Sequence, residues 1–110
     1  LSRGLGDVYK RQIVILDNKH RFLSETTVTV GLLNRSLVHP REVFAEAIEQ
    51  RAAAIICIHN HPSGDSSPSE EDKRITRRLQ ESGELLGIPL LDHVIISKED
   101  FTSFADEGWL

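Results

Sequence analysis

Two short strands account for the hydrophobic pattern in the first part of the chain. A mostly β-branched apolar run, IVILD, occupies residues 13–17 and ends at the turn-forming residues Asp17 and Asn18. Residues 22–33 then alternate between threonine and valine, which is the period-two pattern of a strand with one buried face. Gly31 interrupts this run and predicts a bulge or a close backbone approach. The pattern therefore predicts a strand, a turn and a returning strand.

A helix and a buried strand are predicted next. Residues 40–51 begin with Pro40, which is well suited to the first helical position. Their apolar residues recur at helical spacing and form one stripe, the pattern of a helix packed on a sheet. The stripe consists of Val43, Phe44, Ala47 and Ile48. Residues 52–58, AAAIICI, are continuously apolar, as expected for a central strand covered on both faces.

The second half of the chain repeats the alternation of helix and strand. Residues 73–81 have the apolar edge of a helix, and Gly83 and Gly87 are candidate positions for its end. Residues 90–96 read as a second buried strand, and residues 100–110 as a final hairpin arm and cap. The tail is expected to close the core with Phe101, Phe104 and Trp109. The order β-β-α-β-α-β predicts an α/β domain with three layers, in which helices flank a mixed central sheet.

Composition narrows the class of protein further. A chain of 110 residues, with 39% hydrophobic and 27% charged residues, is expected to form one globular domain. No apolar run approaches the roughly 18 residues that a membrane-spanning helix needs. The lone cysteine, Cys57, is interpreted as a buried hydrophobe and fits a reducing cytoplasm. A net charge of −4 argues against nucleic acid as the main partner. A cluster of basic residues on one helix is interpreted as a solvated face, with a local nucleic-acid-binding patch as the alternative: Arg74, Arg77 and Arg78.

The candidate chemistry lies in residues 59–72, HNHPSGDSSPSEED. His59 and His61 are two residues apart at the end of a predicted strand, so their side chains point the same way. The Ser69-x-x-Asp72 pattern is by itself a helix capping box. If the loop doubles back, the first turn of the helix brings Asp72 to the two imidazoles. Three protein ligands with one position left for water are typical of a catalytic zinc site, whereas a structural site closes all four.

This motif resembles a known family. The spacing His-x-His-Pro, six residues, Ser, two residues, Asp is similar to the JAMM (MPN) metallohydrolase signature, in the form found in its RadC branch. The flanking segments VHPREVFAEAI, LLGIPLLDHVIIS and SFADEGWL also resemble RadC proteins, so the likeness covers residues 13–110. It implies an MPN domain related to the cytidine deaminases. It also implies Zn2+ held by three ligands, His59, His61 and Asp72, with Ser69 hydrogen-bonding the oxyanion. The expected reaction is hydrolysis of an amide or isopeptide bond in a protein or peptide substrate.

The first residues of the chain do not fit this resemblance. Residues 1–12, LSRGLGDVYKRQ, carry two glycines and no clean period. In the family, the first strand begins with a glutamate that serves as general base, and here that position falls near Tyr9 or Lys10. The string resembles translated sequencing-adapter readthrough joined to a truncated gene fragment, which would explain the missing glutamate. The alternative is a genuinely divergent N-terminus.

Two further residues are candidates for supporting roles. Glu42 lies in the first turn of the predicted helix 40–51, where the helix dipole favours a carboxylate. Dipole and capping are enough to explain Glu42, and the functional alternative is a catalytic role that partly replaces the missing base. His93 is interpreted as a hydrogen-bonded core histidine, with a contact to a metal ligand as the alternative.

The sequence also bears on three other functions. An HNH nuclease distributes its three motif residues over a strand, a loop and a helix, whereas here they are adjacent. A zinc deaminase requires H-x-E and P-C-x-x-C motifs, which a chain with one cysteine cannot supply. The serious alternative is a catalytically weak or inactive MPN module that serves as an interaction scaffold or a DNA-repair accessory protein. The substrate and the oligomeric state stay open.

Overall fold

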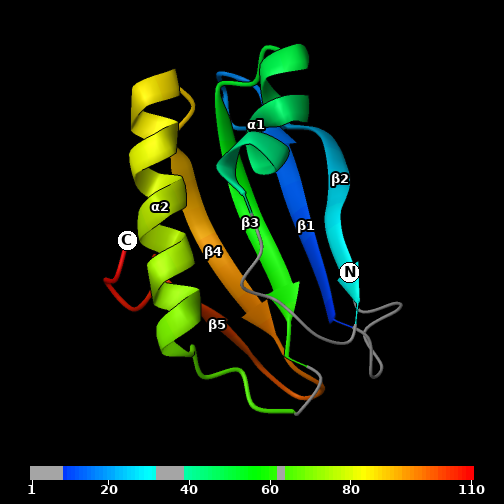
Figure 1. Ribbon diagram of the computed structural model, residues 1–110, viewed down its shortest axis with the longest axis vertical. Coiled ribbons are helices and arrows are strands. Elements are labelled where there is room, and N and C mark those ends of the chain that lie inside the picture. Colours follow the sequence, from blue (N-terminus) through cyan, green and yellow to red (C-terminus); the bar gives the residue numbers. More distant parts are fainter. Residues whose placement is uncertain (1–8, 32–38, 62–63) are drawn as a thin grey trace.

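A five-stranded mixed sheet forms the body of the protein (Figure 1). The computed structural model describes residues 9–31, 39–61 and 64–110. The elements in chain order are β1 (Tyr9–Leu16), β2 (Phe22–Gly31), α1 (Pro40–Glu49), β3 (Ala54–Asn60), α2 (Glu70–Leu86), β4 (Leu90–Ile96) and β5 (Phe101–Ser103). The strand order is β2-β1-β3-β4-β5. Only β3 and β4 are parallel neighbours, and the other neighbouring pairs are antiparallel.

Both helices lie on the same face of this sheet, in front of it in Figure 1, and they contact each other. The strand order explains this placement. β2 and β3 are both antiparallel to β1 and therefore parallel to each other, so α1 and α2 each belong to a crossover between parallel strands. Both crossovers advance in the same direction across the sheet, and right-handed connections then place both helices on one side. The α/β class and the mixed sheet are confirmed, whereas the expected third layer is not seen among the described residues.

The hydrophobic core fills the space between the sheet and the two helices. Alternate residues of the central strands face it, including Ile13, Ile15, Ile55 and Cys57, each with 0% of its surface exposed. The helices contribute Val43, Phe44, Ala47, Ile75 and Leu79. Burial raises the pKa of the Cys57 thiol, which agrees with its interpretation as a buried hydrophobe. The opposite face of β3 is also covered, as predicted, because Ala54 and Ile58 are buried and only Ile56 between them is half-buried.

The hairpin differs from its prediction at the start of its first strand. β1 begins at Tyr9, four residues before the predicted start, so residues 9–12 belong to a strand. Residues 1–8 and the predicted strand end at 32–33 lie outside the described residues. The register of the hairpin does not shift at Gly31 but at two other places, between Arg11 and Gln12 and between Ile15 and Leu16 of β1.

The second helix is longer than its pattern predicted. It continues through Gly83 and ends at Gly87, which has a left-handed φ of 73°. The N–H of Ile88 donates to the carbonyl of Gly83 at 2.8 Å, a bond typical of a glycine-terminated helix. Of the two predicted ends, Gly87 is confirmed and Gly83 is wrong.

The C-terminal tail closes the core with one aromatic residue rather than three. Phe104 is 1% exposed, but Phe101 is 63% exposed and Trp109 is 48% exposed. Phe101 begins β5, a three-residue strand at the edge of the sheet, so it has a neighbouring strand on one side only.

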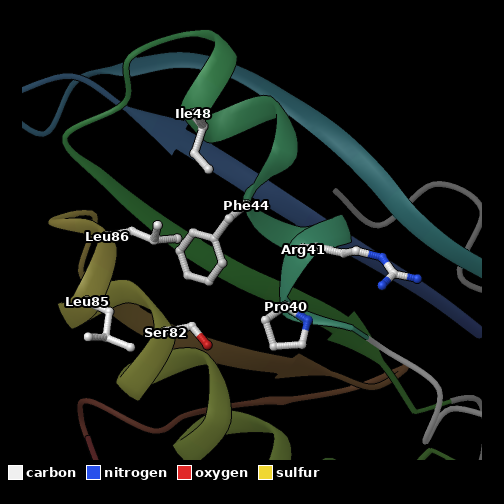
Figure 2. A pocket seen from close by; sticks show the side chains of 7 residues that line it. All are labelled: Pro40, Arg41, Phe44, Ile48, Ser82, Leu85 and Leu86. Carbon is white, nitrogen blue, oxygen red and sulfur yellow. The ribbon is translucent and has the colours of Figure 1, made fainter.

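Where α1 and α2 meet, a surface pocket of about 370 Å³ opens between them (Figure 2). Its lining is mostly apolar and includes Phe44, Ile48, Leu85 and Leu86. Leu85 is 89% exposed at its rim. None of the described helices is long and apolar enough to cross a membrane.

Candidate metal centre

The candidate site lies where β3 ends and α2 begins. His59 is the penultimate residue of β3 and pairs with Arg11 of β1 on one side and Ile95 of β4 on the other. His61 follows the strand, and its N–H donates to the carbonyl of Ile96 at 2.9 Å, which keeps the backbone beside β4. The two imidazoles therefore lie on the same side, with ring centroids 4.9 Å apart.

A capping box brings the carboxylate into this site. The Ser69 hydroxyl accepts a hydrogen bond from the N–H of Asp72 at 3.0 Å, and Asp72 Oδ2 accepts one from the N–H of Ser69 at 2.9 Å. These reciprocal bonds satisfy two of the unpaired donors at the start of α2. They also hold the Asp72 side chain, which is 5% exposed, against the histidines.

The three side chains form one tight, buried cluster. Nε2 of His59 lies 3.1 Å from Asp72 Oδ1, and Nε2 of His61 lies 3.0 Å from Asp72 Oδ2. The two Nε2 atoms are 3.1 Å apart. The structure thus brings together the three residues predicted as metal ligands, with one ligand atom from each within 4.8 Å of the others.

The hydrogen bond of His61 indicates which nitrogen of its ring carries a hydrogen. Its Nδ1 lies 2.9 Å from the backbone carbonyl of Asp65, which can only accept, so Nδ1 carries the hydrogen. In the neutral ring Nε2 is then a lone pair, and it faces the carboxylate of Asp72. These atoms lie close enough to share one cation, either a metal ion or a proton carried by an imidazole. Two imidazole nitrogens and one carboxylate oxygen are a donor set that fits Zn2+.

The burial of the site sets the protonation of its members. Burial is the main cause that lowers the pKa of His59 to about 4, although Asp72 beside it acts in the opposite direction. Burial raises the pKa of Asp72, but the interactions with His59 and His61 outweigh this and hold it well below its usual range. At neutral pH His59 is therefore uncharged and Asp72 ionised, which are the forms that bind metal ions.

The two residues predicted as catalytic lie in different places. Ser69 is exposed at the N-cap of α2, next to the cluster, and its hydroxyl is engaged with the backbone of Asp72. Glu42 is exposed in the first turn of α1 and does not belong to the group that could hold a metal. The catalytic roles of both residues stay predictions.

The position expected for the family glutamate lies alongside the site. The N–H of Lys10 donates to Oδ1 of Asn60 at 2.6 Å, so the first residues of β1 run beside the end of β3. A carboxylate is missing from this place, because the residues at the two candidate positions are Tyr9 and Lys10.

Two further residues lie next to the candidate ligands, and the sequence analysis named only His93, with a contact to a metal ligand as the alternative interpretation. His93 is fully buried, as expected of a core histidine, but its Nε2 also lies 2.7 Å from Nδ1 of His59. Thr76 follows Asp72 by four residues on α2, and its hydroxyl lies next to His93. The helical spacing from Asp72 was a signal for Thr76, whereas His93 reaches His59 only through the pairing of β3 with β4.

Comparison with known proteins agrees with these features. Residues 9–109 match the family model described as "RadC-like JAB domain". The chain is 55% identical over 97 residues to a UPF0758 protein of Bacillus licheniformis, an alignment that covers 88% of this chain and 43% of the relative. It is 50% identical over 99 residues to a UPF0758 protein of Thermotoga maritima, covering 90% of this chain and 45% of the relative. The chain thus spans less than half the length of these relatives, whose names state no activity.

Proposed function

Because the chain belongs to the family of RadC-like JAB domains, we propose that it is a zinc-dependent metallohydrolase acting on amide or isopeptide bonds of a protein or peptide. The observation that supports this most is the contact among His59, His61 and Asp72. Their nitrogen and oxygen atoms meet at 3.0–3.1 Å inside the protein, an arrangement that could hold a metal ion. The buried lone cysteine further supports the cytoplasm as the location.

His59, His61 and Asp72 would hold the metal. Zn2+ at this site would supply a Lewis acid that polarises a substrate carbonyl and activates water. The protein contributes the orientation of the ligands. The carbonyl of Asp65 holds the His61 ring, and the capping box holds the Asp72 carboxylate.

Ser69 is the proposed oxyanion donor. Its oxygen accepts from the N–H of Asp72, so the hydroxyl hydrogen can be donated elsewhere. A hydroxyl fixed at a helix N-terminus beside the ligands is suited to stabilise negative charge that develops on a substrate oxygen.

Proton transfer is the weak step of the reaction in this chain. A positioned general base is worth roughly 10²–10⁴-fold in rate, and the family glutamate is missing at Tyr9 or Lys10. The chain as printed is therefore expected to bind Zn2+ well and to hydrolyse slowly, with Glu42 as a less favoured substitute base. The same absence favours the second candidate function, a non-catalytic MPN interaction module or DNA-repair accessory protein.

Titration of the metal-free protein with Zn2+ tests the proposed site. We expect the wild-type chain to bind one equivalent, and His61→Ala to bind at least about 100-fold more weakly because it removes a ligand. His20→Asn is the matched control, since His20 is exposed in a turn with a left-handed φ of 59° that asparagine tolerates. Equal affinity of wild type and His61→Ala would overturn the metal site.

A second measurement separates the enzyme from the scaffold. Zinc-dependent cleavage of a random-peptide library that is lost in His61→Ala supports the hydrolase. Full cellular function of His61→Ala supports the non-catalytic module.

A further inference from the structure

His93 and Thr76 form a hydrogen-bonded chain behind the candidate ligand His59. We propose that these two residues are positioning residues, which fix His59 in the tautomer that presents Nε2 to the metal. The inference rests on the proposed metal site. These hydrogen bonds connect the backbone of α2 to β4 and then to β3. The donor and the acceptor of each bond follow from the chemistry of the groups.

The Thr76 hydroxyl determines which groups donate and which accept in this series of hydrogen bonds. This group donates to the backbone carbonyl of Asp72 at 2.8 Å, one helical turn earlier. A hydroxyl has a single hydrogen, so toward Nδ1 of His93, at 2.5 Å, Thr76 can only accept. Nδ1 of His93 therefore carries a hydrogen.

Nε2, the second nitrogen of His93, faces the candidate ligand His59. The ring is 0% exposed and carries a hydrogen on Nδ1. With its one hydrogen on Nδ1, Nε2 is an acceptor. Arg11 agrees with this assignment, because Nη1 of its guanidinium, a group that can only donate, lies 3.4 Å from the same Nε2.

The last step reaches the metal ligand. Nδ1 of His59 lies 2.7 Å from Nε2 of His93, so His59 donates its hydrogen there. Its Nε2 is then a lone pair directed at the cluster, 3.1 Å from Asp72 Oδ1. The backbone carbonyl of Asp65 imposes the same tautomer on His61.

The hydrogen-bond partners of His59 and His61 differ in whether they can exchange the roles of donor and acceptor. A backbone carbonyl cannot donate, so the tautomer of His61 is fixed. A histidine can exchange its donor and acceptor nitrogens, so His93 needs the Thr76 hydroxyl to hold it in one state. If His93 reversed, the hydrogen of His59 would move to Nε2 and occupy the position of the metal. Contacts to the outer nitrogen of a ligating histidine typically affect metal affinity about 10- to 100-fold.

Thr76→Val and Thr76→Ser test this chain, because valine keeps the shape of threonine and serine keeps its hydroxyl. We expect Thr76→Val to weaken Zn2+ binding by about 10- to 100-fold in competition with a chromogenic chelator, and Thr76→Ser to bind like wild type. The thermal stability of each metal-free variant is measured in parallel, to separate an effect on the ligand from a general loss of folding.

The imidazole nitrogens can be observed directly. In ¹⁵N–¹H correlation spectra of the metal-free protein, we expect His59 to carry its hydrogen on Nδ1 in wild type and Thr76→Ser, and partly or wholly on Nε2 in Thr76→Val. An Nε2-protonated His59 in wild type, or wild-type zinc affinity in Thr76→Val, would overturn the inference. If wild type binds no zinc, the proposed function fails, while the spectra still decide the direction of the chain.

Discussion

At the scale of single residues, Asp72 combines two tasks in one carboxylate. Its Oδ2 accepts from the N–H of Ser69 and also faces His61, while Oδ1 faces His59. A carboxylate has about four lone-pair sites, so capping and metal binding do not compete. The sequence pattern Ser69-x-x-Asp72 left cap and ligand as alternatives, and the structure shows a cap whose carboxylate lies in the cluster.

A glutamate introduced at position 9 tests the missing base. Arg11 lies opposite His59 in the paired strands, and residues two apart in a strand share a face. A glutamate at position 9 would therefore lie on the face of His59, and one at position 10 on the opposite face. We expect Tyr9→Glu to raise zinc-dependent cleavage of a peptide library by roughly 10²–10⁴-fold.

Lys10→Glu is the control, because it places the same carboxylate one residue away, although the net charge then falls by two units rather than one. Its cleavage rate should remain at the level of the unmodified chain. Equal rates for the two variants would show that the first strand does not supply the base.

The depressed pKa of His59 makes the stability of the metal-free protein depend on pH. The pKa falls from 6.5 to about 4 on folding, so between these values the unfolded chain binds a proton that the folded protein rejects. Stability is therefore fully present above about pH 6.5 and is lost as the pH falls toward 4. The loss from this residue is of the order of 3 kcal/mol, and His93, whose pKa is also lowered, acts in the same direction.

Urea unfolding of the metal-free protein at several pH values between 7 and 4 measures this dependence. His59→Asn should flatten it, and His20→Asn should leave it unchanged. A stability that is independent of pH in wild type would contradict the assignment of a neutral buried imidazole.

At the scale of elements, Gly83 shows how a tertiary contact overrides a helix propensity. In an exposed helix, Gly→Ala stabilises by about 1 kcal/mol. Here a Cβ at position 83 would lie 2.5 Å from the backbone oxygen of Ile88, which is held in the turn after α2. We expect Gly83→Ala to destabilise the protein by about 1–3 kcal/mol in urea unfolding.

Ser82→Ala, in the same turn of α2, serves as the comparison for Gly83→Ala. It changes a half-buried side chain without adding an atom near Ile88 and should alter stability by less than about 1 kcal/mol. A Gly83→Ala variant more stable than wild type would contradict this prediction, because the turn after α2 would then shift without a loss of stability. The sequence alone predicts a helix end at Gly83. The contact that requires glycine there is with Ile88, five residues later in the turn after α2, so a local pattern does not reveal it.

At the scale of the whole molecule, the site links the end of β3 to the start of α2 across a loop. These segments meet only in the folded protein, so a ligand that binds all three side chains stabilises folding. With free Zn2+ at 100 times its dissociation constant, the gain is about 2.7 kcal/mol.

Thermal unfolding with and without Zn2+ measures this gain. We expect the midpoint to rise by about 10 °C in wild type and to return to its original value after a chelator is added. Asp72→Asn should show little or no rise, and a rise equal to that of wild type would place the zinc elsewhere.

Local interactions explain what the sequence alone determined. The apolar run before His59 specified a buried strand, the spacing of His59 and His61 placed both rings on one side, and Ser69 and Asp72 specified the start of a helix. Each of these depends on residues within one turn or one strand, so the pattern carries the necessary information. The α/β class and the mixed sheet follow from the alternation of such elements.

Only the tertiary structure decided the order and pairing of the strands. That order places both helices on one face, where three layers had been expected, and the parallel pairing of β3 with β4 brings His93 to His59 across 34 positions of sequence. Burial then fixes which nitrogen carries each hydrogen, because a buried polar atom must find a partner among its neighbours in space. Such partners are chosen by packing between distant segments, which no local pattern records.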